Sequence, residues 1–482
     1  MFDLRPVGYV TGLLIALLGA AMLIPMVVDL VDGNDHWPVF LESAILSMLC
    51  GGLMALACAN ALGQGLSIRQ TFLLTSGVWL ALPIFGALPF VMGATDATPV
   101  DAFFEAMSGL TTTGATVFAD LETLPRGLLF WRAILQWIGG IGIIVVAMVF
   151  LPELRVGGMQ IFRTESFDTF GKILPRAAEI ASRIVWVYVG ITFVGFLAYM
   201  AAGMDRFDAV AHALTSVSTG GFSTEDRSFG AFRGGPEYVA IVMMLVSSLP
   251  FVLYIQLMAG RGRPLLRDRQ VRAYLMVILG SSAAFVAYRV LNAGLGWELA
   301  IRETLFNVIS IISGTGYAST DYQLWGTVAV MVFFLLGLIG GCAGSTSCSV
   351  KVFRYQILFS AIQAQIRLIH SPRGLFVPRY SGRPIGEDVI SSVMSFFVLF
   401  LVTLGALSVL LGMTGLDFVT SLSGAASALA NIGPGLGEII GPAGNFGPLN
   451  DTAKWLLAAA MLIGRLELLA FYAIFSLNFW RA

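Results

Sequence analysis

The sequence predicts an all-α integral membrane protein with four tandem helix, pore-loop, helix repeats around a pseudo-fourfold pore, preceded by an extra N-terminal helix pair. Three observations support this fold class: an apolar composition, apolar runs that recur along the whole chain, and a glycine-centred segment that appears four times between pairs of these runs. The segments read TTTGATVF from Thr111, VSTGGFST from Val217, SGTGYAST from Ser313 and ANIGPGLG from Ala430.

The composition places the chain in a membrane. Of its 482 residues, 57% are hydrophobic and 12% are charged, and the mean hydropathy is +0.84. Soluble proteins carry about 25% charged residues. We interpret the four cysteines, which lie in or beside apolar runs, as small packing residues; they are Cys50, Cys58, Cys342 and Cys348.

Ten apolar runs are long enough to cross a bilayer, since a span needs roughly 20 residues. They cover about 7–31, 40–62, 70–92, 127–151, 184–202, 237–259, 273–293, 325–350, 389–412 and 452–478. The first two runs have no glycine segment between them, and each of the four later pairs has one. The predicted units are therefore an extra helix pair at 1–66 and pore repeats at 67–155, 156–262, 263–354 and 355–482.

Charged residues predict the orientation. Basic residues gather in the connections between hairpins, which the positive-inside rule assigns to the cytoplasm together with both termini. They are Arg155, Arg163, Lys172, Arg176, Arg183, Arg261, Arg263, Arg267, Arg269, Arg272, Lys351, Arg354, Arg367, Arg373, Arg379 and Arg383. Acidic residues gather around the glycine segments, so a cation meets a negative vestibule outside.

A stretch too short to span the membrane precedes each glycine segment. Three of these stretches begin with an aspartate suited to a helix start, at Asp101, Asp208 and Asp417, and the other follows Glu298. Irregular backbone is tolerated at this depth only where it is buried in protein or lines a water-filled cavity. Carbonyls there can replace the water shell of a monovalent cation.

Glycine suits such a loop because it adopts backbone angles that other residues resist. The alternative is that these segments are turns or close helix contacts. The neighbouring hydroxyls either add ligands to the ion or serve as caps and helix back-bonds. The candidate ion-binding residues are Thr112, Thr113, Gly114, Thr219, Gly220, Gly221, Thr315, Gly316, Asn431, Ile432 and Gly433.

The segments GLTTTGATV, VSTGGFS, SGTGYA and NIGPG, in that order, resemble the four filter loops of the Trk/Ktr/HKT superfamily of potassium transporters, in particular the bacterial TrkH/TrkG type of membrane subunit. The resemblance covers nearly the whole chain. It implies one filter glycine per loop, at Gly114, Gly220, Gly316 and Gly433, with Gly221 as a register alternative. It also implies K⁺ as the transported ion, no organic cofactor, and uptake that is either channel-like or a symport with H⁺ or Na⁺.

The resemblance extends to a gate. The eighth run is interrupted at 340–350 by a segment similar to the glycine-rich intramembrane loop of this family, with the candidate residues Gly340, Gly341, Gly344, Ser345, Thr346 and Ser347. The alternative is a tight crossing of small residues. Arg465 resembles the family's pore-facing arginine, and its alternative is a salt bridge with Glu467 or another acid. For Lys351 we expect the side chain to extend to the cytoplasmic surface.

The resemblance further implies a homodimer in the bacterial inner membrane and a cytoplasmic TrkA-type ring that binds nucleotides such as NAD or ATP. Its docking surface would be the basic loops at 151–183, 259–272 and 351–387, which anionic lipids could also occupy. We expect no nucleic-acid partner and no enzyme activity, since no nucleotide loop or nucleophile triad is found. The competing function is a secondary transporter of an organic solute, which would favour a twofold or inverted repeat.

Overall fold

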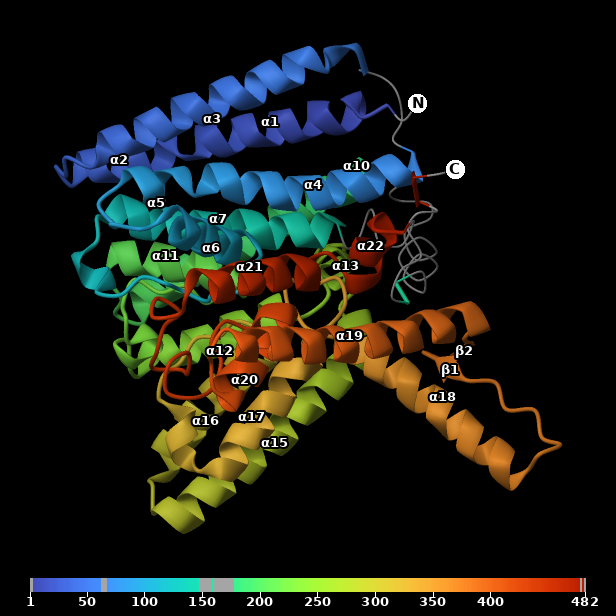
Figure 1. Ribbon diagram of the computed structural model, residues 1–482. Coiled ribbons are helices and arrows are strands. Elements are labelled where there is room, and N and C mark those ends of the chain that lie inside the picture. Colours follow the sequence, from blue (N-terminus) through green and yellow to red (C-terminus); the bar gives the residue numbers. More distant parts are fainter. Residues whose placement is uncertain (1–2, 62–66, 147–157, 160–176, 477–478, 481–482) are drawn as a thin grey trace.

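The computed structural model describes residues 3–61, 67–146, 158–159, 177–476 and 479–480. In this part of the chain the regular secondary structure is helical apart from one hairpin of two-residue strands, in which β1 (Arg379–Tyr380) pairs antiparallel with β2 (Arg383–Pro384). Both termini lie at the same end of the molecule, which we call the terminal end (Figure 1). The end opposite to it is called the far end.

The chain begins with a helical hairpin that precedes the repeats. Helices α1 (Arg5–Ala21) and α2 (Leu23–Val31) together form one long span, and α3 (Trp37–Ala57) returns beside α1 before the short η1 (Ala59–Ala61). Gly12 and Gly51 permit close packing of α1 on α3, because a Cβ at either position would lie 2.7 Å or less from backbone atoms of the other helix.

Four units of helix, short helix, glycine segment and helix follow, as predicted. Repeat 1 contains α4 (Ile68–Gly86), α5 (Leu88–Met92), α6 (Pro99–Leu110), η2 (Leu121–Thr123) and α7 (Arg126–Val145). Repeat 2 contains α10 (Ala177–Ala201), α11 (Arg206–Val217), η4 (Ser228–Gly230), α12 (Gly235–Ser247) and α13 (Phe251–Met258), and α14 (Arg263–Arg267) leads on from it.

The second half repeats the same order of elements. Repeat 3 contains α15 (Arg269–Ala293), α16 (Trp297–Ser313), η5 (Tyr322–Trp325) and α17 (Thr327–Ile339), and α18 (Val352–His370) leads from it into repeat 4. Repeat 4 contains α19 (Glu387–Met413), α20 (Phe418–Ala430), α21 (Asp451–Arg465) and α22 (Leu468–Ile474). Helix α18 and the segment after it project from the body of the molecule at the terminal end (Figure 1).

The predicted spans agree with the structure except where the chain bends. Seven described helices are long and apolar enough to cross a membrane, or up to nine if each bent pair counts as one span. The sixth run bends by 92° between α12 and α13, and the tenth by 108° between α21 and α22. The eighth run forms a helix only to Ile339, and residues 340–351 are a non-helical loop.

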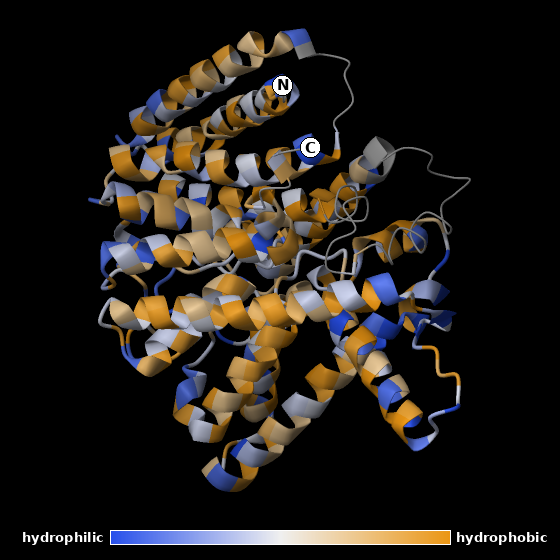
Figure 2. Cartoon of the chain, turned by 45° about the vertical axis from the view of Figure 1, so that its right-hand side comes forward, coloured by the Kyte–Doolittle hydropathy of each residue, from blue (hydrophilic) through white to orange (hydrophobic). Residues whose placement is uncertain are grey.

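The surface of the bundle fits a lipid environment. Figure 2 shows hydrophobic residues along the length of the long helices and hydrophilic residues mainly near their ends. Leu17 of α1, Leu53 of α3 and Val402 of α19 are 62 to 66% exposed. Because such side chains gain no burial within the chain, they fit a bilayer that surrounds the protein.

The short helices α6, α11, α16 and α20 start at the far end, but two of their caps differ from the prediction. Asp417 caps α20 as expected, accepting from the amides of Val419 and Thr420 at 3.0 and 3.1 Å. Helix α6 is capped by Thr98 and α11 by Asp205, so Asp101 and Asp208 lie in the first turn. They still complement the positive end of the helix dipole.

Candidate functional site

The four glycine segments, called glycine loops 1 to 4 in chain order, share one backbone conformation. Each short helix ends in a left-handed residue, and the amide of the next residue donates to the carbonyl five residues earlier. This hydrogen bond belongs to the Schellman motif, which closes a helix C-terminus. The left-handed residues are Thr112, Thr219, Gly314 and Asn431, and the bonded pairs are Thr113–Ser108, Gly220–Thr215, Thr315–Ser310 and Ile432–Ser427, at 2.9 to 3.0 Å.

Two residues after each left-handed residue stands a glycine that also has positive φ. These glycines are Gly114, Gly221, Gly316 and Gly433, with φ of 83°, 80°, 81° and 108°. In loop 2 the shared conformation therefore falls on Gly221. Gly220, the expected position, is equivalent to Thr113, Thr315 and Ile432 instead. Sequence alone could not separate two adjacent glycines.

The four glycines and the carbonyls that they face form a closed circle, called the glycine ring. A Cβ on each glycine would collide with a carbonyl oxygen of the next loop, so only glycine fits at these positions. The order is loop 1 to 2, 2 to 3, 3 to 4 and 4 back to 1. The Cβ to oxygen distances would be 2.1 Å from Gly114 to Gly220, 1.8 Å from Gly221 to Thr315, 2.1 Å from Gly316 to Ile432 and 2.8 Å from Gly433 to Thr113.

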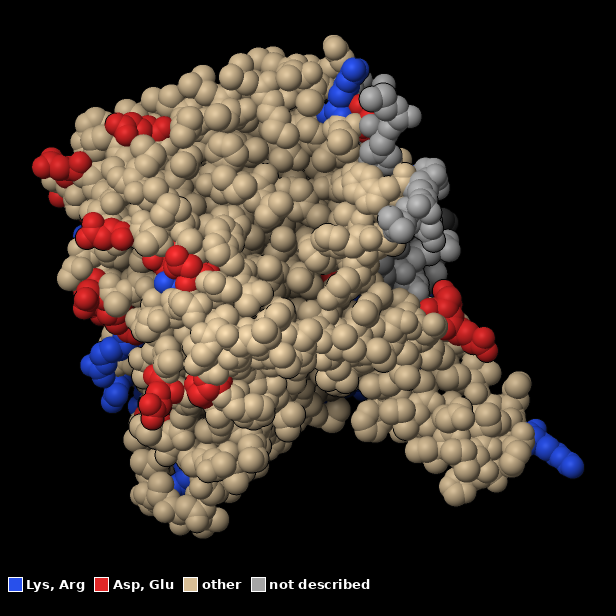
Figure 3. Space-filling model, in the orientation of Figure 1, with Lys and Arg blue, Asp and Glu red and all other residues tan. Residues whose placement is uncertain are grey.

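A cavity of about 170 Å³ opens on the far side of the ring and is lined by all four ring glycines. The segments that follow the glycines form its wall, including Glu225 and Asp226 of loop 2. Figure 3 shows that acidic residues gather along the edge of the molecule opposite to the termini. The cavity therefore forms a vestibule whose surroundings attract cations.

Glu225 has an unusual protonation equilibrium in this vestibule. Partial burial, together with a hydrogen bond to the Glu122 carboxyl, raises the pKa of Glu225 to about 7. The negative charges of Glu122, Asp208 and Asp226 act in the same direction. Glu225 thus changes its charge near neutral pH.

Side chains from the flanking helices hold the glycine loops. Gln136 of α7 donates to the Gly220 carbonyl at 2.6 Å and accepts from the Phe222 amide at 3.0 Å. Arg132, one turn earlier, donates to the Ser223 carbonyl at 2.8 Å and pairs with buried Glu105 at 2.8 Å. The sequence analysis missed both residues, although two polar side chains inside a run from 127 to 151 were a visible signal.

Neighbouring loops are also tied to one another around the circle. The Tyr317 hydroxyl of loop 3 bonds the Thr215 hydroxyl at 2.5 Å, between repeats 3 and 2. The Gln323 amide bonds both the carbonyl and the amide of Gly437, at 3.2 and 2.7 Å, between repeats 3 and 4. The Phe446 amide donates to the Thr116 carbonyl at 2.8 Å, between repeats 4 and 1. The Arg132 to Ser223 bond completes the circuit between repeats 1 and 2.

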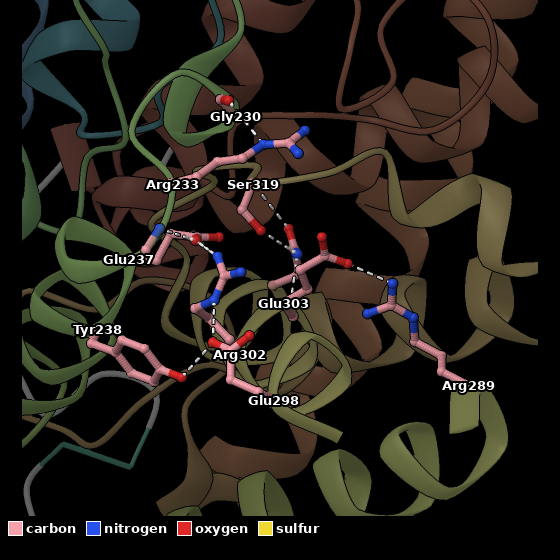
Figure 4. A network of polar contacts seen from close by, with 11 residues as sticks. Gly230, Arg233, Glu237, Tyr238, Arg289, Glu298, Arg302, Glu303 and Ser319 are labelled. Carbon is pink, nitrogen blue, oxygen red and sulfur yellow. Dashed lines mark hydrogen bonds and ion pairs between the residues drawn. The ribbon is translucent and has the colours of Figure 1, made fainter. Parts of the chain in front are cut away.

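An ion-pair network fixes α16 against its neighbours (Figure 4). Arg302 of α16 pairs with Glu298 one turn earlier and with Glu237 of α12. Glu303 pairs with Arg289 of α15 at 2.5 Å. These groups are mostly buried, so losing one partner would leave an uncompensated charge, which costs more than breaking a surface pair.

The candidate hydroxyls in the glycine loops have partners within the protein. Thr113 bonds Thr111 at 2.7 Å and receives a hydrogen bond from Asn431 at 2.8 Å. Thr315 bonds Ser313 and Thr219 bonds the Ser218 carbonyl, both at 2.7 Å. These bonds indicate that the hydroxyls stabilise the conformation of the loops. Asn431 likewise bonds a neighbouring loop and the Met461 carbonyl.

The glycine-serine loop, residues 340–351, lies on the side of the glycine ring where the short helices end. Ser347 donates to the Ser313 carbonyl at the end of α16, and Cys348 Sγ lies 3.7 Å from the Thr112 hydroxyl. The Thr346 hydroxyl is anchored to the Ser247 carbonyl at 3.0 Å. The loop is buried almost throughout. It therefore packs against the end of α16, glycine loop 1 and the end of α12.

Below this loop lie three cations, Lys351, Arg354 and Arg465. The structure contradicts the surface position expected for Lys351 and, for Arg465, only the alternative of a pair with Glu467. Arg465 does not pair with Glu467, because Glu467 pairs with Arg354. Arg465 instead bonds Cys348 Sγ at 2.6 Å and the Thr346 carbonyl at 3.5 Å. Lys351 does not reach the surface, since it is only 6% exposed and lines a small cavity with Arg354 and Arg465.

The histidine in repeat 2 belongs to the scaffold. His212 is fully buried, and its ring nitrogens lie 2.8 Å from the Asp208 carbonyl and 3.0 Å from the Ser223 hydroxyl. Of the predicted basic docking residues, Arg155, Arg163, Lys172 and Arg176 lie outside the described residues.

Comparison with known proteins decides the family. The model of the TrkH family, described as a cation transport protein, matches residues 36–291 and 295–480. The chain belongs to the TrkH family. It is 42% identical to the Trk system potassium uptake protein TrkI of Halomonas elongata over 99% of this chain and 97% of that protein. It is 33% identical to the Trk system potassium uptake protein TrkH of Escherichia coli K12 over 99% of both.

The fold of this TrkH-family chain is also that of a solved relative. The crystal structure of the potassium transporter TrkH from Vibrio parahaemolyticus superposes with a TM-score of 0.92, at 31% identity and over all of both chains. The four repeats and the extra helix pair are thus features of the family fold.

Proposed function

We propose that this protein takes up K⁺ across the bacterial inner membrane, with the glycine ring as its selectivity filter. The observation that carries the proposal is the closed circle of four positive-φ glycines, each facing a carbonyl of the next loop. Backbone carbonyls in such a ring replace the hydration shell of a monovalent cation. The family and the names of the relatives support K⁺ as the ion.

In this proposal the glycine-serine loop is the gate, and Arg465 is an electrostatic barrier beneath it. The hydrogen bonds of Thr346 and Ser347 hold the loop against the ring, and Arg465 bonds Cys348 of the same loop. A cation that leaves the ring must displace this loop and pass a buried guanidinium. Opening therefore requires the loop and Arg465 to move together.

The orientation, the assembly and the partner belong to the same proposal. Both termini lie in the cytoplasm and the vestibule opens outward, in agreement with acidic residues at the far end (Figure 3). The protein is a homodimer whose cytoplasmic loops, including residues 259–272 and 351–387, bind a TrkA-type nucleotide-binding ring. The relatives' names, which refer to a Trk system, support such a partner.

The test is ⁸⁶Rb⁺ uptake into liposomes that contain the purified protein, with K⁺, Na⁺ or an organic solute as competitor. We expect K⁺ to block uptake and the organic solute to have no effect. Uptake that an organic solute blocks would favour the competing secondary transporter, whose broken helices bind solute at the membrane midplane. If no uptake appears, the nucleotide-binding subunit is added. Uptake that then appears indicates that the gate was closed, and uptake that stays absent contradicts the proposed function.

A further inference from the structure

The small cavity beneath the glycine-serine loop holds more positive than negative charge. It is lined by Lys351, Arg354 and Arg465 and by one carboxylate, that of Glu467. These four residues are at most 6% exposed. Arg354 is compensated, because it pairs with Glu467, donates to the Val350 carbonyl at 3.0 Å and stacks on Phe396.

The other two cations lack a carboxylate partner among the described residues. Arg465 uses only Nη1, for Cys348 and the Thr346 carbonyl, and its buried Nε and Nη2 atoms find no hydrogen-bond acceptor there. Lys351, beside the same cavity, forms no ion pair with any described carboxylate. Buried cations without counter-charge are costly, so an arrangement of this kind favours a bound anion.

The cavity has the size for a small ion. Its volume is about 20 Å³, which is room for about one water-sized particle. Among the residues that line it, the Nε and Nη2 atoms of Arg465 and the Ser349 hydroxyl have no hydrogen-bond partner in the described part of the chain, so the cavity presents free donors. A larger anion such as a phosphate ester does not fit this space.

We propose that this cavity binds one chloride-sized monovalent anion between Lys351 and Arg465. The anion accepts hydrogen bonds from the Lys351 ammonium and from the free nitrogens of Arg465. Its charge offsets positive charge that otherwise opposes a cation below the glycine ring. The inference rests on the charges around the cavity and does not depend on which ion the ring selects.

The test is saturable binding of ³⁶Cl⁻ to the purified full-length protein in potassium gluconate, read without any flux. We expect the wild type to bind chloride, bromide to displace it, and Lys351→Met to lose most of the binding. Lys454→Met is the matched control, because Lys454 is also buried but pairs with Asp101 at 2.5 Å. We expect Lys454→Met to bind chloride like the wild type.

Absence of saturable chloride binding to the wild type would overturn the proposal. Equal binding to wild type and to Lys351→Met would also overturn it, since the ion would then lie elsewhere. If Lys351→Met does not fold, the site is tested by anomalous diffraction from a wild-type crystal grown in bromide. An anomalous peak between Lys351 and Arg465 supports the site, and a peak absent from this cavity contradicts it.

Discussion

At the scale of single residues, Gln136 shows how one side chain fixes a glycine loop. Its amide bonds both the Gly220 carbonyl and the Phe222 amide, on either side of Gly221. Gly220 supplies one of the four carbonyls of the glycine ring. The position of this carbonyl therefore depends on a residue of α7 that does not belong to the ring.

We predict that Gln136→Met lowers the preference of the protein for K⁺ over Na⁺. The change leaves two buried backbone groups without partners, at about 1 to 3 kcal/mol each, which is enough to distort loop 2. The preference is measured as the inhibition of ⁸⁶Rb⁺ uptake by Na⁺. Gln363→Met, at an exposed position of α18, is the control. An unchanged preference for K⁺ over Na⁺ in Gln136→Met would contradict the role of Gln136 in holding loop 2.

Glu225 leads to a prediction on pH. A carboxyl whose pKa is raised to about 7 is mostly neutral at pH 6 and mostly charged at pH 8. Raising the pH thus adds negative charge to the vestibule, and we expect uptake at low K⁺ concentration to rise with it. Uptake is measured from pH 6 to 8 at constant K⁺.

The variant Glu225→Gln should make this pH profile flatter, because it removes the group that titrates. Glu438→Gln provides the comparison, since Glu438 is exposed and does not line the vestibule. A profile that stays equally steep in Glu225→Gln would assign the pH dependence to another group.

At the scale of elements, the glycine-serine loop breaks a helix and is hydrogen-bonded to several neighbouring elements. Gly340 has φ 78° and ψ −179°, so α17 cannot continue past Ile339. The loop is anchored to repeat 2 through Thr346 and Ser247 and to the end of α16 through Ser347 and Ser313. If this loop is the gate, as proposed, losing one anchor shifts it toward its open state.

We predict that Thr346→Val increases K⁺ uptake in the absence of a partner subunit. The valine keeps the shape of the side chain and removes the hydrogen bond from the hydroxyl to the Ser247 carbonyl, while the bond from the Thr346 amide to the same carbonyl stays. The closed state thus loses about 1 kcal/mol and the open population rises roughly fivefold. Initial rates of ⁸⁶Rb⁺ uptake measure the effect. Thr346→Ser retains the hydroxyl and should behave like wild type; an equal rise in both variants would argue against this anchor.

Sequence patterns predicted much of the element order, because length and apolarity identify spans and glycine-rich segments recur between them. They did not predict the bends. The turn between α12 and α13 depends on Pro250 and on a hydrogen bond from the Phe251 amide to Gly344, a residue nearly one hundred positions away. Likewise, Glu467 adopts φ 65° at the second bend, where it pairs with Arg354 of another repeat.

At the scale of the whole molecule, four similar units enclose one ring. Each unit ends its short helix with the same Schellman motif, and each ring glycine meets a carbonyl of the next unit. The resemblance to known filter loops located these segments. It could not fix the register of loop 2 or the burial of Lys351, because both depend on contacts between distant repeats.

The most direct test of the ring compares four substitutions, Gly114→Ser, Gly221→Ser, Gly316→Ser and Gly433→Ser, with Gly405→Ser in α19, where a Cβ meets open space. The measurement is the inhibition of ⁸⁶Rb⁺ uptake by Na⁺ in liposomes. We predict that each ring substitution weakens the discrimination against Na⁺ or abolishes uptake, while Gly405→Ser matches the wild type. Wild-type discrimination in any of the four ring variants would contradict a filter made of one glycine from each repeat.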